Sequence, residues 1–109
     1  MKLLKAIIRP NKVDDVKDAL AKLNLSGITV TEVRGHGKQK GHTAIYRGKE
    51  YNVSLLPKME IEVVVPDSIA EDAIKAIVQA ARTGEIGDGR VFVLPVAESY
   101  KIRTGEMES

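Results

Sequence analysis

The chain of 109 residues is predicted to form one α+β domain, residues 1–109, with the ferredoxin-like β-α-β-β-α-β order. Two observations carry this prediction. Segments with strand-like and helix-like apolar periodicity alternate in that order along the chain. In addition, Ile8-Arg9-Pro10 recurs as Val64-Val65-Pro66 at an offset of 56 residues, and each copy joins a strand to a helix. Two such units form a four-stranded antiparallel sheet with both helices on one face.

The first half begins with an apolar strand, residues 3–8, which Pro10 ends because proline cannot donate a ladder hydrogen bond. An amphipathic helix is expected over residues 12–24, where apolar side chains recur every three or four positions. A second strand follows over residues 28–33, which are rich in β-branched side chains. Residues 37–54 then lack any periodicity. This stretch exceeds the roughly 12 to 15 residues usual for a structureless connection, which is typical of a functional loop.

The second half resumes with alternating apolar and polar residues over 59–65 and stops at Pro66. Asp67 is expected to cap a helix that runs toward Gly84. The last strand, residues 90–94, is apolar on both of its faces, and a polar tail begins at Glu98. Because no further helix can cover the second face of the sheet, we expect another copy of the chain to cover it. The sequence thus predicts a homo-oligomer.

Composition excludes several classes of site. The absence of cysteine excludes disulfides, thiol catalysis and thiolate metal sites. No run of eighteen apolar residues and no signal-peptide core is present, so a cytoplasmic protein is expected. The net charge is only +2, yet residues 34–58 carry six Lys or Arg against Glu50 alone. This local positive field suits an anion site or a docking loop.

Seven of the nine glycines lie in two segments, residues 35–48 and 84–89. Glycine accepts positive φ and lacks a Cβ, so successive N–H groups can converge on an oxygen-rich ligand. Gly87 and Gly89, beside Asp88 and Arg90, are typical of such a phosphate-binding nest, whereas Gly84 suits a helix cap equally well. Neither a Walker A motif nor GxGxxG is present.

The chain shows no catalytic constellation, which indicates a binding protein. His36 and His42 lack the nearby Cys, Asp or Glu that a zinc site needs. Two other classes remain open. One is a nucleotide-hydrolysing or nucleotide-transferring enzyme on the same fold, because fold alone does not settle function. The other is an RNA-recognition module, which the absence of aromatic residues from the first three predicted strands argues against.

Four segments together resemble the PII signal-transduction proteins of the GlnB and GlnK type, which regulate nitrogen metabolism. They are TVTEVRGHGKQKGHTAIYRGKEY from Thr29, LLPKMEIEVVV from Leu55, TGEIGDGRVFV from Thr83 and IRTGE from Ile102. The resemblance covers essentially the whole chain. It implies a homotrimer with ATP or ADP in three clefts between subunits. It also implies three functional loops, the T-loop (about residues 37–55), the B-loop (82–90) and the C-loop (98–109).

The resemblance also implies ligand contacts. The phosphates would meet the B-loop of one subunit and the C-loop of its neighbour, and other residues would surround the adenosine. The implied ATP and ADP contacts are Ile7, Thr29, Gly35, Gly37, Lys38, Gln39, Glu62, Val64, Thr83, Gly87, Asp88, Gly89, Arg90, Lys101 and Arg103. For Val64, the residues alone favour packing at an interface over ligand contact.

A second effector, 2-oxoglutarate, is implied together with Mg²⁺, which Gln39 would bind beside the ATP phosphates, since Mg²⁺ prefers oxygen ligands. The implied 2-oxoglutarate contacts are Gln39, Lys40, Gly41, Lys58 and Gly87. ADP lacks the γ-phosphate of that metal bridge, so only the Mg-ATP state should bind 2-oxoglutarate well. The implied role is that of a regulator without enzymatic activity, with at most slow incidental ATP hydrolysis.

The T-loop would carry the signal to other proteins. Arg47 would dock into an ammonium transporter of the Amt type, and Tyr51 is the position that a nucleotidylyltransferase modifies in this family. Nitrogen-metabolism enzymes are the other implied targets. Contact with a membrane would occur only through a transporter, and nucleic acid is not an expected partner.

The chain departs from the common pattern of the family at three implied ligand positions, Lys38, Arg90 and Lys101. Many members carry Arg, Lys and Arg there, so the charge is kept but the bidentate geometry is not. Lys49 stands where cyanobacterial relatives carry a phosphorylated serine, which excludes that modification here.

Overall fold

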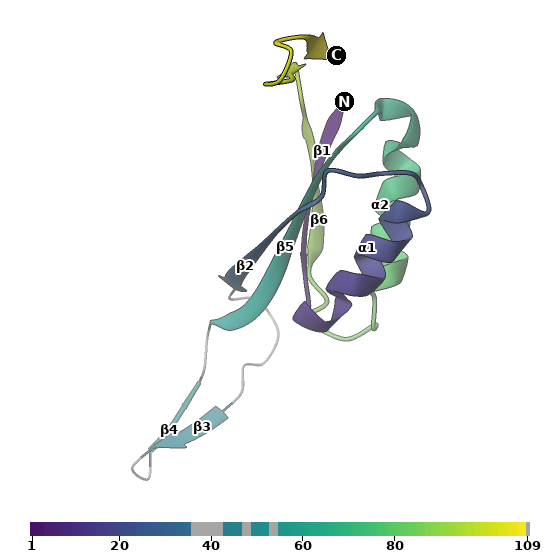
Figure 1. Ribbon diagram of the computed structural model, residues 1–109. Helices are drawn as coiled ribbons and strands as arrows, with labels where there is room; N and C mark the ends of the chain where they lie inside the picture. Colours follow the sequence, from purple (N-terminus) through teal and green to yellow (C-terminus); the bar gives the residue numbers. More distant parts are fainter. Residues whose placement is uncertain (36–42, 47–48, 53–54, 109) are drawn as a thin grey trace.

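The computed structural model describes residues 1–35, 43–46, 49–52 and 55–108, with the backbone alone for 43–46 and 49–52. It confirms the predicted fold, a four-stranded antiparallel sheet with α1 and α2 packed on one face (Figure 1). The strand order is β2-β5-β1-β6. The elements of this layer pair are β1 (Lys2–Ile8), the 3-10 turn η1 (Pro10–Lys12), α1 (Val13–Ala21), β2 (Thr29–Gly35), β5 (Leu56–Val65), α2 (Asp67–Ala81) and β6 (Arg90–Pro95).

The core lies between the sheet and the two helices. Alternate residues of β1 and β5 point into it, while α2 contributes alanines that allow close approach to the strands. This is the period-two and helical patterning that the sequence predicts. The buried apolar residues are Leu4, Ala6, Ile8, Val16, Leu20, Ile61, Val63, Val65, Ala70, Ala73, Ile77 and Ala81.

Several predicted element ends were wrong. The helix expected over residues 12–24 spans only Val13–Ala21, because Pro10 starts a 3-10 turn and the chain leaves the helix through Asn24 at φ 59°. Asp67 is the first residue of α2 and not its cap. Its carboxylate instead lies 3.1 Å from the amino group of Met1, where a negative charge also suits the positive end of the helix. Gly84 does not cap α2, which already ends at Ala81.

Secondary structure within residues 37–54 was not predicted, because this stretch lacks apolar periodicity. It contains the hairpin strands β3 (Thr43–Tyr46) and β4 (Lys49–Asn52), and the C-terminal tail forms β7 (Ser99–Tyr100) and β8 (Met107–Glu108). Each hairpin is a two-stranded sheet separate from the main one. Backbone pairing alone is enough to define such a hairpin, so it need not show the apolar alternation of a half-buried strand.

The face of the sheet opposite the helices carries apolar side chains that the described part of the chain leaves exposed. On this face β1 and β6 pair Leu3 with Leu94 and Lys5 with Phe92. Val64, Phe92 and Leu94 keep 44%, 45% and 39% of their surface in contact with solvent. The predicted need for a cover on this face therefore stands.

Gly89 marks the closest approach between the B-loop and the sheet. It has φ 102°, and a Cβ at this position would lie 1.7 Å from the carbonyl oxygen of Ile7. That distance is far below any van der Waals contact, and the obstacle is backbone, which cannot swing aside. Only glycine permits this approach.

We predict that Gly89→Ala lowers the free energy of unfolding by about 2 kcal/mol or more, because backbone strain and a clash with β1 add together. Gly84→Ala is the matched control, since Gly84 has φ 90° but a Cβ there would meet no neighbouring atom within 4 Å. It should lose only the strain. Urea unfolding of both variants at one protomer concentration measures the difference, and equal losses would contradict the role assigned to the Ile7 contact.

Candidate anion-binding site

The B-loop lies at one end of the sheet, which we call the loop end. Here β1 and β2 finish, β5 and β6 start, and Ile7 pairs with Arg90 while Gly35 pairs with Leu56. In Figure 1 the B-loop joins the lower end of α2 to β6. Positive φ angles at Gly84, Gly87 and Gly89 confirm the predicted need for glycine in the loop. Such angles allow successive N–H groups to form an anion-binding nest.

The carboxylate of Asp88 organises the loop from within. One oxygen accepts the N–H groups of Thr83 and Gly84 at 2.9 and 2.8 Å. The other accepts the Thr83 hydroxyl and, at 3.1 Å, the Nε–H of Arg9. These bonds, that of the Thr83 hydroxyl foremost, hold the pKa of Asp88 well below its ordinary value. Asp88 is therefore ionised and fully engaged at neutral pH.

Two cations, Arg9 just after β1 and Lys58 on β5, donate hydrogen bonds to the outer turn of the loop, which is formed by Ile86 and Gly87. Arg9 donates a second hydrogen bond from Nη2 to the carbonyl oxygen of Ile86 at 3.0 Å, and Lys58 donates from Nζ to that of Gly87 at 2.7 Å. Lys58 is 7% exposed, and this burial, reinforced by the nearby charge of Arg9, lowers its pKa although Asp88 opposes the shift. Within the described residues Lys58 forms no ion pair. An anion placed beside Lys58 would offset the electrostatic repulsion between Lys58 and Arg9.

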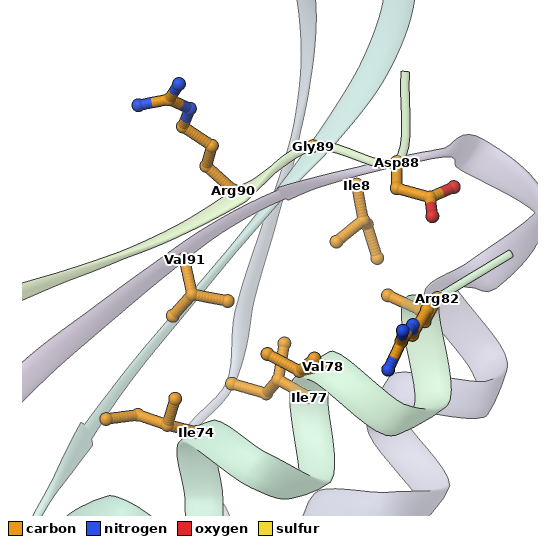
Figure 2. Close-up of a pocket in the computed structure, with 10 residues that line it drawn as sticks. Ile8, Ile74, Ile77, Val78, Arg82, Asp88, Gly89, Arg90 and Val91 are labelled. Carbon is orange, nitrogen blue, oxygen red and sulfur yellow. The ribbon is translucent and has the colours of Figure 1, made fainter. Parts of the chain in front are cut away.

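A pocket of about 380 Å³ lies on the helix side of the sheet, between α2 and the start of β6. Its floor is apolar, and Figure 2 shows Ile8, Ile77 and Val91 directed into it while the side chain of Arg90 extends away. Arg90 is exposed and can therefore reach a ligand outside this pocket. The pocket shares Asp88, Gly89 and Arg90 with the loop nest, but its apolar floor lies on the helix side of the sheet.

The predicted ligand residues fall into two groups at opposite ends of the sheet. The loop-end group is Ile7, Gly35, Lys58, Thr83, Gly87, Asp88, Gly89 and Arg90. The second group lies toward or beyond the far end and comprises Thr29, Glu62, Val64, Lys101 and Arg103. Lys58 and Val64 are six residues apart on β5, roughly 20 Å in an extended strand. Figure 1 shows the C-terminal segment at the end of the sheet opposite the B-loop.

The side chains of the remaining predicted residues lie outside the described part of the chain. Tyr51 belongs to β4, where the backbone alone is described. The others are Gly37, Lys38, Gln39, Lys40, Gly41 and Arg47. The two histidines, His36 and His42, also lie outside the described residues. Among the described residues no cluster of three or more His, Cys, Asp or Glu could hold a metal ion.

Two roles were not predicted from the sequence, that of Arg9 and that of the Asp88 carboxylate. The sequence places Arg9 only at a strand end, although a cation beside Pro10 is held in extended backbone at a fixed exit from the sheet. The ligand contact expected of Asp88 stays a prediction, and the structure adds that its carboxylate accepts hydrogen bonds from the loop itself. Its spacing of five residues from Thr83 within a glycine-rich loop was the available signal.

Comparison with known proteins gives one consistent result. The family model described as nitrogen regulatory protein P-II matches residues 1–106. The nitrogen regulatory protein P-II of Azospirillum brasilense is 60% identical over 106 residues, which cover 97% of this chain and 95% of the relative. With the same coverage, nitrogen regulatory protein P-II 1 of Escherichia coli K12 is 56% identical. That of Haemophilus influenzae, named nitrogen regulatory protein P-II, is 54% identical.

No helix in the described ranges is both long and apolar enough to cross a membrane. The family match over residues 1–106 and these identities agree with the ferredoxin-like sheet and the glycine-rich loop. The chain belongs to the family of nitrogen regulatory protein P-II.

Proposed function

We propose that this protein senses ATP or ADP together with 2-oxoglutarate in clefts between copies of the chain, and controls nitrogen-metabolism targets through the T-loop. The observation that carries this proposal is the B-loop, which Asp88, Arg9 and Lys58 hold in a shape suited to phosphate. Family membership supports a regulatory role. The enzyme alternative has no support from the relatives, which are named as regulatory proteins, and ATP hydrolysis would be slow and incidental.

The phosphates are proposed to lie against the N–H groups of Gly87, Asp88 and Gly89, with Arg90 as the charged partner. Backbone N–H groups and a guanidinium are the donors that recur in phosphate sites. The side chain of Asp88 is engaged by Thr83 and Arg9, so its negative charge is already compensated and does not repel the ligand.

The division of the ligand residues between two ends of the sheet supports a site shared by neighbouring copies. Thr29, Glu62 and Val64 would contact the adenosine, while Lys101 and Arg103 would reach the phosphates bound at the loop end of the next copy. Within one chain these residues are too far from the B-loop to do so. The open face with Phe92 and Leu94 offers the surface for such assembly, which we propose is a trimer.

Lys58 is the proposed partner of the distal carboxylate of 2-oxoglutarate. It is buried, its charge is disfavoured there, and a dicarboxylate would compensate that charge. Mg²⁺ would join the ligand to the ATP phosphates, with Gln39 completing its oxygen shell. Lys40 and Gly41 are the further proposed contacts. ADP lacks the γ-phosphate for this bridge, so 2-oxoglutarate binding would report the Mg-ATP state.

The T-loop begins and ends beside this site, which supports its role as the output. Gly35 and Leu56, which flank the loop, pair with each other, and the Cγ of Lys58 lies 3.6 Å from the position of a Cβ on Gly35. A ligand at Lys58 would therefore act on both ends of the loop. We propose that Arg47 contacts an Amt-type ammonium transporter and that Tyr51 is open to nucleotidylation, in a cytoplasmic protein.

A shared site predicts complementation between defective copies. Arg90→Ala would remove the phosphate contact of one group, and the double variant Lys101→Ala/Arg103→Ala that of the other, each weakening Mg-ADP binding about tenfold or more. In mixed oligomers refolded from equal amounts, about one quarter of the clefts would combine two intact groups. Calorimetric titration of the mixed oligomers with Mg-ADP should then detect this fraction of clefts binding as tightly as in the wild type. Recovery of none, with mixing confirmed by mass spectrometry, would contradict a site between copies.

The role of Lys58 predicts a selective loss. Lys58→Ala should weaken 2-oxoglutarate binding in the presence of Mg-ATP about tenfold or more, because it removes the charged partner of a carboxylate. Mg-ADP affinity should fall by less, since Arg9 still holds the adjacent peptide. The exposed Lys75 on α2 is the charge-matched control. Calorimetric titration measures both ligands, and unchanged 2-oxoglutarate affinity in Lys58→Ala would remove this residue from the site.

A further inference from the structure

We propose that Arg9 is a positioning residue of the nucleotide site, which fixes the peptide planes of the B-loop so that their N–H groups face the phosphates. This inference rests on the proposed function and assigns it a residue that sequence reasoning left out. Arg9 itself does not touch the ligand. It acts through Ile86 and Asp88, the two loop residues that its guanidinium contacts.

The guanidinium of Arg9 contacts two residues of the B-loop at once. Its Nε–H meets the carboxylate of Asp88 at 3.1 Å, and Nη2 meets the carbonyl oxygen of Ile86 at 3.0 Å. One rigid planar group thus fixes the positions of both Ile86 and Asp88. A lysine ammonium is a point charge without this fork and could not fix both partners in one plane.

Because the peptide bond is planar, the direction of each loop carbonyl also fixes the direction of the following N–H group. In a trans peptide the N–H points opposite to the C=O of the preceding residue, and no described peptide bond is cis. The carbonyl of Ile86 points at Arg9 and that of Gly87 at Lys58. The N–H of Gly87 therefore points away from Arg9, and that of Asp88 points away from Lys58. Residues 86 and 87 form a turn, and among the described residues neither N–H forms a hydrogen bond of normal geometry with a backbone or side-chain acceptor.

The anchor of Arg9 is itself rigid. The preceding Ile8 is 2% exposed in the core, and the following Pro10 holds Arg9 in extended backbone at φ −65° and ψ 142°. The loop, by contrast, has glycines at 84 and 87 and exposed residues from 82 to 86. Without the tether it would sample other peptide orientations. The apparent affinity for phosphate would then fall in proportion to the fraction of competent loops.

The test is calorimetric titration of Mg-ADP into the full oligomer of four proteins: wild type, Arg9→Met, Arg9→Lys and the control Lys12→Met. Lys12 is a nearby cation whose only ion pair within the described residues is with Asp15. We expect Arg9→Met to bind Mg-ADP about tenfold or more weakly, Arg9→Lys to recover only part of this loss, and Lys12→Met to stay within about twofold of wild type.

Adenosine separates positioning from general damage to the fold. Because Arg9 acts on the phosphate contacts alone, the affinity for adenosine should stay within about twofold of wild type while that for Mg-ADP falls. Equal losses for both ligands would overturn the proposal, as would full recovery in Arg9→Lys or unchanged Mg-ADP binding in Arg9→Met. Arg9→Lys retains the charge near Asp88 and carries the test if Arg9→Met does not fold. Failure of the wild type to bind Mg-ADP would instead refute the proposed function, and this inference with it.

Discussion

The hydrogen bonds around the Asp88 carboxylate are the interaction on which the site depends. They join the start of the B-loop, at Thr83 and Gly84, to the end of β1, at Arg9. These segments are far apart in the sequence, so the carboxylate fixes a loop that local propensity alone could not hold. Because Arg9 and the other donors compensate the charge of ionised Asp88, the loop can still present backbone N–H groups to an anion. The approach of Gly89 to Ile7 then sets the depth of the loop against the sheet.

The antiparallel sheet imposes the second constraint, since it sends the two groups of proposed ligand residues to opposite ends. β6 starts at Arg90 beside the B-loop and ends at Pro95 opposite Lys2, so it carries the C-terminal segment away from the loop end. A single copy cannot bring both groups to one ligand. Assembly through the open face would satisfy two requirements together, the burial of exposed apolar residues and the completion of a binding site. Ligand binding would thereby be coupled to the arrangement of the copies.

The regular part of the fold could be predicted from the sequence because one-sided burial leaves a period. The alternation of Ile61, Val63 and Val65 and the spacing of Val16 and Leu20 are examples of such patterns. The hairpin of β3 and β4 escaped prediction because backbone pairing leaves little periodic trace. The contribution of Arg9 also escaped it, since its bond to Asp88 spans 79 residues and depends on the final packing. Glycine clustering indicated the site, but only the structure gives the orientation of its peptides.

Amide resonances of the isotopically labelled protein test the central claim most directly, that the B-loop binds phosphate through its backbone. Titration with Mg-ADP should shift the amide signals of Gly87, Asp88 and Gly89 more than those of the exposed face of α2. Adenosine should move these three signals little. Shifts confined to Ile74, Ile77 and Val78 on the apolar floor of the pocket, or loop signals unchanged at saturating Mg-ADP, would contradict the account.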